Sequence, residues 1–382
     1  MHKIKLAILT PDYYPNFYAG IGVHVYSLVE SLLKNHDIDI TVFVVRCETL
    51  INNSPRIYEA PKGVKVYEFS GSEKPLNDSL NYFTYKWTKN NIIAIEYLST
   101  ILSEMDFDLI HCHDIFSIWA MDLLRRKLNI PVVSTIHARF AGENEIGDAL
   151  RGFLCRTSDT CIAVSNNLAN ELKDRYKIED VKVVYNGITK SKIFGPVKKE
   201  NYITYCGRMA KTKGIDTLLK AFSLLIQNDK YKDLKLILIG DGDCRNDYEK
   251  LVQSLHINKN VIFQGRVSNS IARNIISKSL VHIVPSTYEA FATVIEEAMI
   301  EQTCVIVSKV GGAAELIENG VNGILFEPNN IKELEQQMRY VLDNKSIREQ
   351  LEKQALKRAM KFEWSSIANQ IFEIYHDVLH KY

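Results

Sequence analysis

Short apolar runs alternate with amphipathic stretches along the whole chain. In the first half, six runs have the length and β-branched content of strands: IKLAIL, ITVFVV, LIHC, PVVSTI, TCIAVS and VKVVY. Between several of these runs, apolar residues recur at helical spacing, most clearly at Val25, Leu28, Val29, Leu32 and Leu33. This alternation predicts βαβ units and a parallel sheet.

A polar, turn-rich segment from Asn186 to Glu200 interrupts the alternation, which then restarts with YITYCG, LKLILIG, NVIFQG, VHIVPS, CVIVSK and GILFEP. The predicted fold class is therefore α/β, with two Rossmann-like domains over residues 1–187 and 188–363. The tail 364–382 has apolar residues at helical spacing and predicts a terminal helix. Ligands of such folds bind at the carboxyl ends of the strands, so we expect a site in a cleft between two facing domains.

Composition excludes several classes of protein. Among 382 residues, 47 Lys and Arg balance 46 Asp and Glu, which argues against a protein that coats nucleic acid. The seven cysteines form no CxxC pair, which favours free thiols in a reducing compartment over a disulfide framework or a zinc site. The first residues are typical of a strand, and no apolar run approaches the ~20 residues that span a bilayer. These features predict a cytoplasmic protein and leave open a peripheral contact with a membrane surface.

The first chemical signal is the segment VPSTYEAFATVIEEAMI. A strand ends there, Glu289 follows in a turn, and a helix is predicted from Thr293. The free N–H groups and dipole at the start of a helix suit a phosphate. Glu297 lies inside the helix, so two carboxylates would reach two hydroxyl-bearing parts of one ligand. On spacing alone, a solvated helix face carrying Glu296 and Glu297 remains the alternative.

The second signal is the segment YCGRMAKTKGIDTLLKAF, in which a strand leads to Arg208 and then to Lys213 before the next helix. Two cations at a strand-to-helix turn suit a pyrophosphate, because Arg can donate two parallel hydrogen bonds to it and Lys supplies a compact positive charge. A solvated basic loop is the alternative, because Lys211 lies in the same segment.

In their order along the chain, these segments resemble glycosyltransferase family 4, whose members are retaining enzymes of GT-B architecture. The resemblance covers nearly the whole chain. It includes a Pro-x4-Gly-x-Gly loop from Pro15 to Gly22, DFDLIHCHD, PVVSTIHA with His137, VYNGI, GRMAKTKG, LIGDGD, FQGRVS, the Glu-x7-Glu segment and VGGAAELIENGVNGILF. It also implies that the terminal helix 364–382 packs back on the first, acceptor-binding domain, and that the second domain binds a nucleotide sugar.

The resemblance implies a role for each matched position. The catalytic set would be His137, near the donor sugar, with Arg208 and Lys213 on the diphosphate and Glu289 on the sugar hydroxyls. Glu297 would contact the ribose. The remaining donor contacts would be backbone groups: Gly20 and Gly22 near the phosphates, Phe291, Ala292, Thr293 and Val294 at the helix start, and Gly265 to Val267 beside the base.

No metal or other cofactor is expected besides the nucleotide sugar, which acts as a co-substrate. Asp241-Gly242-Asp243 matches a metal-binding DxD, but it directly follows a strand and is interpreted as a turn. His111 and His113 point the same way along a strand, yet further zinc ligands at suitable spacing are missing, so a structural role or a place at the cleft rim is expected. The resemblance favours front-face attack, in which the departing phosphate takes the acceptor proton.

The predicted reaction transfers a hexosyl unit, of glucose or N-acetylglucosamine type, from a UDP-sugar to a hydroxyl of a sugar, glycan, lipid or protein. The alternatives are a glucan-elongating enzyme similar to glycogen synthase, a sugar-nucleotide epimerase and a catalytically weak nucleotide-sugar-binding partner subunit. Ala292 stands where many relatives have glycine, which predicts an altered donor preference. The segment from Leu80, rich in aromatic residues, is an amphipathic helix covering the sheet or a surface for the acceptor or a membrane.

Overall fold

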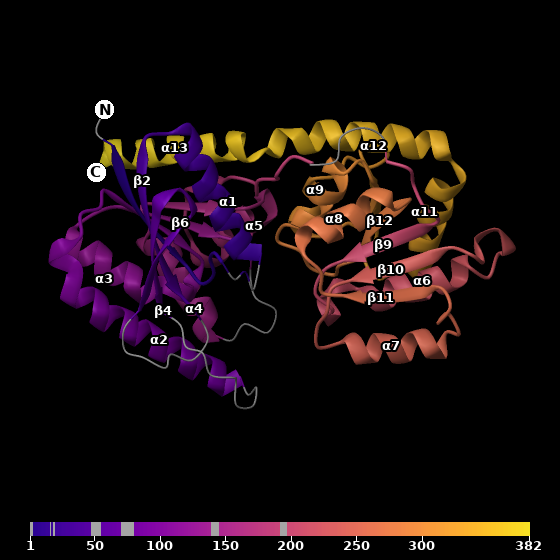
Figure 1. Cartoon of the computed structure of the whole chain (residues 1–382), viewed down its shortest axis with the longest axis horizontal. Helices are drawn as coiled ribbons and strands as arrows, with labels where there is room; N and C mark the ends of the chain where they lie inside the picture. Colours follow the sequence, from indigo (N-terminus) through magenta and orange to yellow (C-terminus); the bar gives the residue numbers. More distant parts are fainter. Residues whose placement is uncertain are drawn as a thin grey trace. The chain divides into compact units, whose positions relative to one another are not determined.

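The computed structural model describes residues 3–15, 17, 20–46, 55–69, 80–138, 145–191 and 197–382. The chain divides into two compact units, Met1–Gly187 with Trp364–Tyr382 and Ile188–Glu363. Each unit is an α/β domain built on its own sheet (Figure 1).

In the described residues of the first unit, the sheet has eight strands in the order β3-β4-β2-β1-β5-β6-β7-β8. Their bounds are β1 Ile4–Thr10, β2 Ile38–Val45, β3 Arg56–Ala60, β4 Val64–Phe69, β5 Leu109–His113, β6 Val132–Ile136, β7 Thr160–Ala163 and β8 Val181–Val183. All six predicted strands are present. The predicted parallel sheet is confirmed except at one edge, where β3 pairs antiparallel with β4. Neither strand has the continuous apolar run that marks a strand buried on both faces.

The helices of the first unit are α1 Gly20–Asn35, α2 Leu80–Ile101, α3 Ile118–Leu128, α4 Glu145–Thr157, α5 Asn166–Tyr176 and α13 Trp364–Lys381. α13 lies alongside α1 (Figure 1). Its residues Ile367, Ile371, Tyr375 and Val378 belong to the same buried cluster as Leu28. The segment from Leu80 is helical, and the side chains of residues 80–90 lie outside the description.

The described part of the second unit has six parallel strands in the order β11-β10-β9-β12-β13-β14. Their bounds are β9 Tyr202–Cys206, β10 Lys235–Ile239, β11 Val261–Gly265, β12 Val281–Val284, β13 Cys304–Ser308 and β14 Ile324–Phe326, as predicted. The helices are α6 Ile215–Leu225, α7 Arg245–Ser254, α8 Asn269–Lys278, α9 Thr293–Ile300, α10 Gly311–Glu315, α11 Ile331–Asp343 and α12 Lys345–Ala359.

Strand order reverses at one place in each sheet, and these places position the candidate sites. In the second unit the reversal lies between β9 and β12, and in the first it lies between β1 and β5. Loops diverge at such a switch point and leave room for a ligand beyond the carboxyl ends of the strands. Arg208 follows β9, Glu289 follows β12 and His113 ends β5.

Two further expectations concern the whole chain. Six of the seven cysteines lie in the described part, where all six are free thiols, and Cys47 lies outside it. Within the described ranges, none of the helices combines the length and the apolar character that a bilayer crossing requires.

Candidate functional site

The turns after β9 and β10 in the second unit pack backbone against backbone. A Cβ atom at Gly240 would lie 2.0 Å from the carbonyl oxygen of Gly207, and one at Gly242 would lie 2.5 Å from that of Met209. Gly240 also has a φ of +123°, which side-chain-bearing residues rarely adopt. Glycine therefore fixes the path of the segment that carries Arg208.

The turn after β9 is also held against the loop after β12. The N–H of Thr287 donates to the carbonyl oxygen of Thr212 at 2.8 Å. A Cβ atom at Gly214 would lie 2.0 Å from the carbonyl oxygen of Pro285. This close approach brings Lys213, which ends a short 3₁₀ turn, beside Glu289.

Lys213 and Glu289 form an ion pair, with Nζ 2.5 Å from Oε1. The hydroxyl of Ser286 donates to the same Oε1 at 2.8 Å. From the sequence, Lys213 was expected to contact the diphosphate and Glu289 the sugar hydroxyls. The structure shows in addition that these two side chains hold each other in position. Arg208 differs, because its side chain is exposed and forms no ion pair within the described ranges. One predicted cation is thus held in place and the other is free to reach a ligand.

Helix α9 begins four residues after Glu289, at Thr293. Ala292 caps the helix without a side-chain hydrogen bond, so its side chain satisfies none of the first N–H groups. The backbone of Ala292 has a φ of −108°, which any L-residue adopts, and its side chain is buried. The methyl group at this position is therefore accommodated without backbone strain. Phe291 and Val294 are half-buried and Thr293 is exposed.

Glu297 lies on α9, half-buried, and its Oε1 accepts a hydrogen bond from the Asn269 side chain at 2.7 Å. Burial raises the pKa of the Glu297 carboxyl, while the hydrogen bond from Asn269 opposes the rise. Glu297 also raises the pKa of Cys206, after the larger effect of burial, which places its charge near the end of β9. The alternative of a solvated helix face is wrong, because Glu297 is half-buried and Glu296 is fully buried.

Glu296 carries a carboxyl group with neither oxygen hydrogen-bonded to a described residue. Burial raises the pKa of Glu296 well above 4.5, and the neighbouring Glu297 raises it further. Between the unfolded and the folded pKa the native state holds a proton that the unfolded chain has lost. The free energy of unfolding therefore falls as pH rises through this window.

Glu296→Leu should raise the free energy of unfolding at pH 7 by about 1–3 kcal/mol, because it removes a buried polar group that lacks a partner. It should also flatten the decline in stability as pH rises above 4.5. Urea unfolding at several pH values measures both effects. Glu349→Leu, at an exposed position of α12, is the control and should change stability by less than about 0.5 kcal/mol. Equal effects of the two substitutions would contradict the assignment.

Asp241-Gly242-Asp243 lies directly after β10, in the turn that the sequence predicts. The Asp241 carboxylate accepts from the N–H of Gly242 at 2.8 Å, and its other oxygen lies 3.4 Å from Arg245. One oxygen thus accepts a hydrogen bond within the turn, and the other pairs with the first residue of α7. Gly265, at the end of β11, has a φ of +73° and accepts from the N–H of Gly240, while Val267 is half-buried in the next loop.

In the first unit, Gly20 and Gly22 lie in the first turn of α1. A Cβ atom at Gly22 would lie 2.5 Å from the Asp12 carboxylate, so this glycine is required by a contact within the protein. A Cβ atom at Gly20 would meet nothing within 4 Å. Asp12 in turn pairs with the buried Arg46 at 2.9 Å. The contact with Asp12 is sufficient to require glycine at position 22, and the ligand contacts expected of Gly20 and Gly22 stay predictions.

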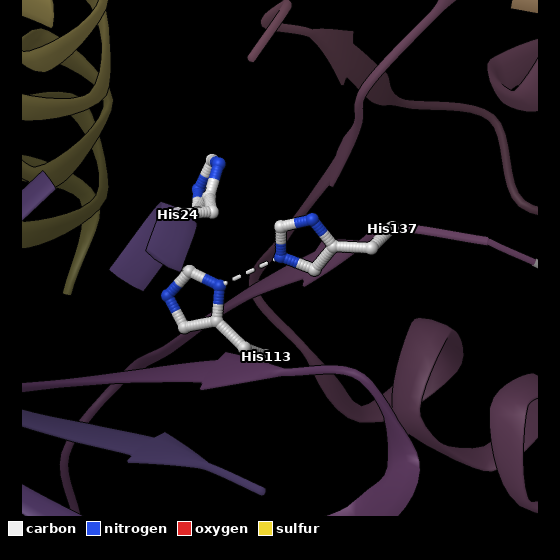
Figure 2. A group of neighbouring side chains, drawn as sticks. All are labelled: His24, His113 and His137. Atoms are coloured by element: carbon white, nitrogen blue, oxygen red, sulfur yellow. Dashed lines mark hydrogen bonds between the residues drawn. The ribbon is translucent and has the colours of Figure 1, made fainter. Parts of the chain in front are cut away.

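His137, just after β6, joins a cluster of imidazoles that the sequence did not predict. Nδ1 of His113 and Nε2 of His137 lie 3.0 Å apart, and the rings of His24 and His137 are 4.5 Å apart between centroids (Figure 2). His111 lies beside them but is satisfied on both nitrogens, by the hydroxyls of Tyr375 at 2.6 Å and Thr135 at 2.7 Å. His111 is thus structural, whereas His113 turns toward His24 and His137.

Burial keeps these imidazoles neutral. It lowers the pKa of His24 to about 3, against a smaller upward effect of the Asn186 side chain, and lowers the pKa of His111 to about 3. Burial first, and then the neighbouring histidines, lower the pKa values of His113 and His137 well below 6.5. The strand ends of β5 and β6 are neighbours, so the proximity of His113 to His137 was predictable from topology, but the position of His24 was not.

Each of the two units matches a glycosyltransferase family model. The family model "Glycosyltransferase Family 4" matches residues 18–192, and "Glycosyl transferases group 1" matches residues 188–358. A glycosyltransferase of uncharacterized specificity from Methanocaldococcus jannaschii is 29% identical, over 97% of this chain and 98% of its own length. Sucrose-phosphate synthase from Thermosynechococcus elongatus has a similar structure, with a TM-score of 0.83 at 22% identity and full coverage of both chains. The Anabaena protein HepE, solved with UDP-glucose, has a TM-score of 0.74 at 19% identity, covering 98% of this chain and 100% of its own.

Proposed function

The chain belongs to the family 4 glycosyltransferases of GT-B architecture, and on that premise we propose that it transfers a hexosyl unit from a UDP-sugar to a hydroxyl acceptor with retention of configuration. The observation that carries the proposal is the switch point of the second unit. There the Lys213–Glu289 pair, the exposed Arg208 and the start of α9 gather at the ends of β9 and β12. Support for UDP comes from HepE, whose structure was solved with UDP-glucose.

The leaving nucleoside diphosphate develops negative charge, and the groups around the switch point stabilise such charge. Lys213 has three N–H donors and uses one on Glu289, so two remain for phosphate oxygens. Arg208 adds a planar guanidinium that can donate two parallel hydrogen bonds. The free N–H groups at the start of α9 add the positive end of the helix dipole. Because Lys213 and the start of α9 are held in place before the reaction, little reorganisation of these two groups opposes charge development.

The carboxylates have acceptor capacity left for hydroxyl groups. Oε1 of Glu289 already accepts from Lys213 and Ser286, which leaves Oε2 for the hydroxyls of the donor sugar. Oε1 of Glu297 accepts from Asn269, which leaves its second oxygen for the ribose hydroxyls. Each carboxylate is thus anchored through one oxygen and can bind through the other.

We expect turnover to survive an excess of chelator, because Arg208 and Lys213 supply the positive charge that a metal would otherwise supply. The carboxylate oxygens of Asp241 are used within the protein, which supports the same expectation. The measurement is donor consumption by chelator-treated protein, with and without added Mg²⁺ or Mn²⁺. Loss of turnover that a metal restores would contradict metal independence.

Three other functions remain as alternatives. A sugar-nucleotide epimerase would convert the donor without an acceptor, and a partner subunit would bind the donor without turning it over. A glucan-elongating enzyme would require a glucan acceptor. Purified chain incubated with UDP-, ADP- and GDP-sugars, alone and with sugar, glycan, lipid and protein acceptors, separates them when donor and product are followed by mass spectrometry. The proposal predicts consumption of a UDP-hexose and an acceptor product of retained anomeric configuration by NMR; inversion, or no transfer with any donor, would overturn it.

A further inference from the structure

Three side chains from separate elements of the first unit converge on one point (Figure 2). His24 comes from the first turns of α1, His113 ends β5 and His137 follows β6. One ring nitrogen from each lies within 4.8 Å of those from the other two. His24 and His113 are buried, and His137 is half-buried, so the group has one open side.

The spacing of the nitrogens is close to that of a metal centre. Bonds of about 2.0–2.1 Å in tetrahedral geometry place two imidazole nitrogens about 3.3 Å apart. Nδ1 of His113 and Nε2 of His137 are 3.0 Å apart, and His24 is near enough to complete a face of three ligands by small rotations.

The hydrogen bonding of the cluster is incomplete. Neither nitrogen of His24 makes a hydrogen bond of good geometry with a described residue, although the Asn186 side chain lies close. Nε2 of His113 likewise has no such partner. A polar atom left without a partner at this depth costs about 1–3 kcal/mol. Coordination through one nitrogen of His24 would use a lone pair that now has no acceptor role, and the metal would replace the hydrogen bond between Nδ1 of His113 and Nε2 of His137.

A negative charge lies next to the cluster. Asp114 follows His113 directly, is fully buried, and accepts from the backbone N–H of His137 at 3.3 Å. Its φ of +56° is unusual for a residue other than glycine and holds the carboxylate at this strand end. A buried carboxylate beside neutral imidazoles would offset the charge of a dication.

We propose that His24, His113 and His137 bind a d-block dication such as Zn²⁺, with the fourth position open on the half-buried side of His137. Imidazole ligands suit Zn²⁺, Ni²⁺ or Cu²⁺, whereas Mg²⁺ and Ca²⁺ prefer oxygen. His111 is excluded from the site because both of its nitrogens are used. The metal would not be required for turnover, since the cations of the second unit supply the charge for the leaving group.

Metal-stripped, full-length protein should bind one Zn²⁺ per chain in competition with a chromogenic chelator. Co²⁺ should give the intense visible absorption of a low-coordinate nitrogen site, and Mg²⁺ should not compete. His137→Ala should weaken Zn²⁺ binding at least about 100-fold, because it removes one of three ligands. The half-buried position of His137 makes this substitution the least disruptive to the fold, and an unchanged melting temperature without metal would verify that.

The control is the double substitution His376→Ala and His380→Ala. These two residues lie one turn apart on α13, with ring centroids 6.1 Å apart, and form the alternative surface site. Binding should be unchanged in this variant. The proposal is overturned if the wild-type chain binds no Zn²⁺, if His137→Ala binds it as tightly as wild type, or if only the double variant loses binding.

One consequence rests on the proposed function. If His137 contacts the donor sugar, Zn²⁺ should inhibit donor consumption and a chelator should restore it. Because binding is measured without donor, failure of this inhibition with intact Zn²⁺ binding would count against the role of His137 and not against the metal site.

Discussion

Arg208→Ala and Lys213→Ala should each lower kcat/KM for donor turnover by about 30- to 1000-fold, which corresponds to about 2–4 kcal/mol of lost transition-state stabilisation. Each substitution removes a positive charge from the proposed site of the leaving diphosphate. The Arg208 side chain is exposed, so its loss should leave the melting temperature unchanged. Lys213→Ala additionally leaves Glu289, only 11% exposed, without its cation. Initial rates of donor consumption measure the effect.

Arg339→Ala is the matched control for charge, since Arg339 forms a surface ion pair with Glu335 on α11. It should change turnover and stability little, because exposed ion pairs contribute about 0–1 kcal/mol. Rates of Arg208→Ala and Lys213→Ala equal to those of Arg339→Ala would show that the two cations do not act on the reaction.

Gly214→Ala should lower the free energy of unfolding by about 3 kcal/mol or more and should also lower turnover. Gly214 has a φ of +62°, and its added Cβ atom would lie 2.0 Å from the carbonyl oxygen of Pro285. Strain in the left-handed region and overpacking against backbone each cost on the order of 1–3 kcal/mol. Relief of the clash would separate Lys213 from Glu289. Chemical denaturation and initial rates measure the two effects.

Gly320→Ala is the control that separates the cost of backbone strain from the cost of the contact with Pro285. Gly320 has a φ of +76°, but a Cβ atom there would meet nothing within 4 Å. This variant should therefore lose only about 1 kcal/mol, through backbone strain, and should keep its turnover. A loss of stability in Gly214→Ala no larger than that in Gly320→Ala would show that the contact with Pro285 does not hold the site together.

Sequence pattern predicted the strands that are apolar over their whole length. LKLILIG and CVIVSK became buried strands because parallel strands covered on both faces have few polar positions. β3 and β4 were missed because an edge pair with one solvated side carries residues such as Arg56 and Lys65. For the segment from Leu80 the sequence left an amphipathic helix and an acceptor or membrane surface open, and the structure shows helix α2 beginning at Leu80.

The helix, strand or turn on which each candidate residue lies was easier to predict than the side chain with which it pairs. The turn after β9 and the start of α9 lie where the sequence placed them, but the pairing of Lys213 with Glu289 spans 76 positions and depends on the packing of Gly214 against Pro285. Glu296 was considered part of a solvated face, since a charged residue on a short helix usually is. Its burial follows from the contact of α9 with α12, which no local pattern reveals.

We expect the nucleotide of the donor to bind at the switch point of the second unit. Amide hydrogen exchange of the purified chain, measured with and without UDP, can test this placement. UDP should slow exchange in peptides covering residues 207–214 and 289–297, and Lys213→Ala should weaken this protection. UDP-dependent protection confined to other parts of the chain, or undiminished in Lys213→Ala, would contradict it.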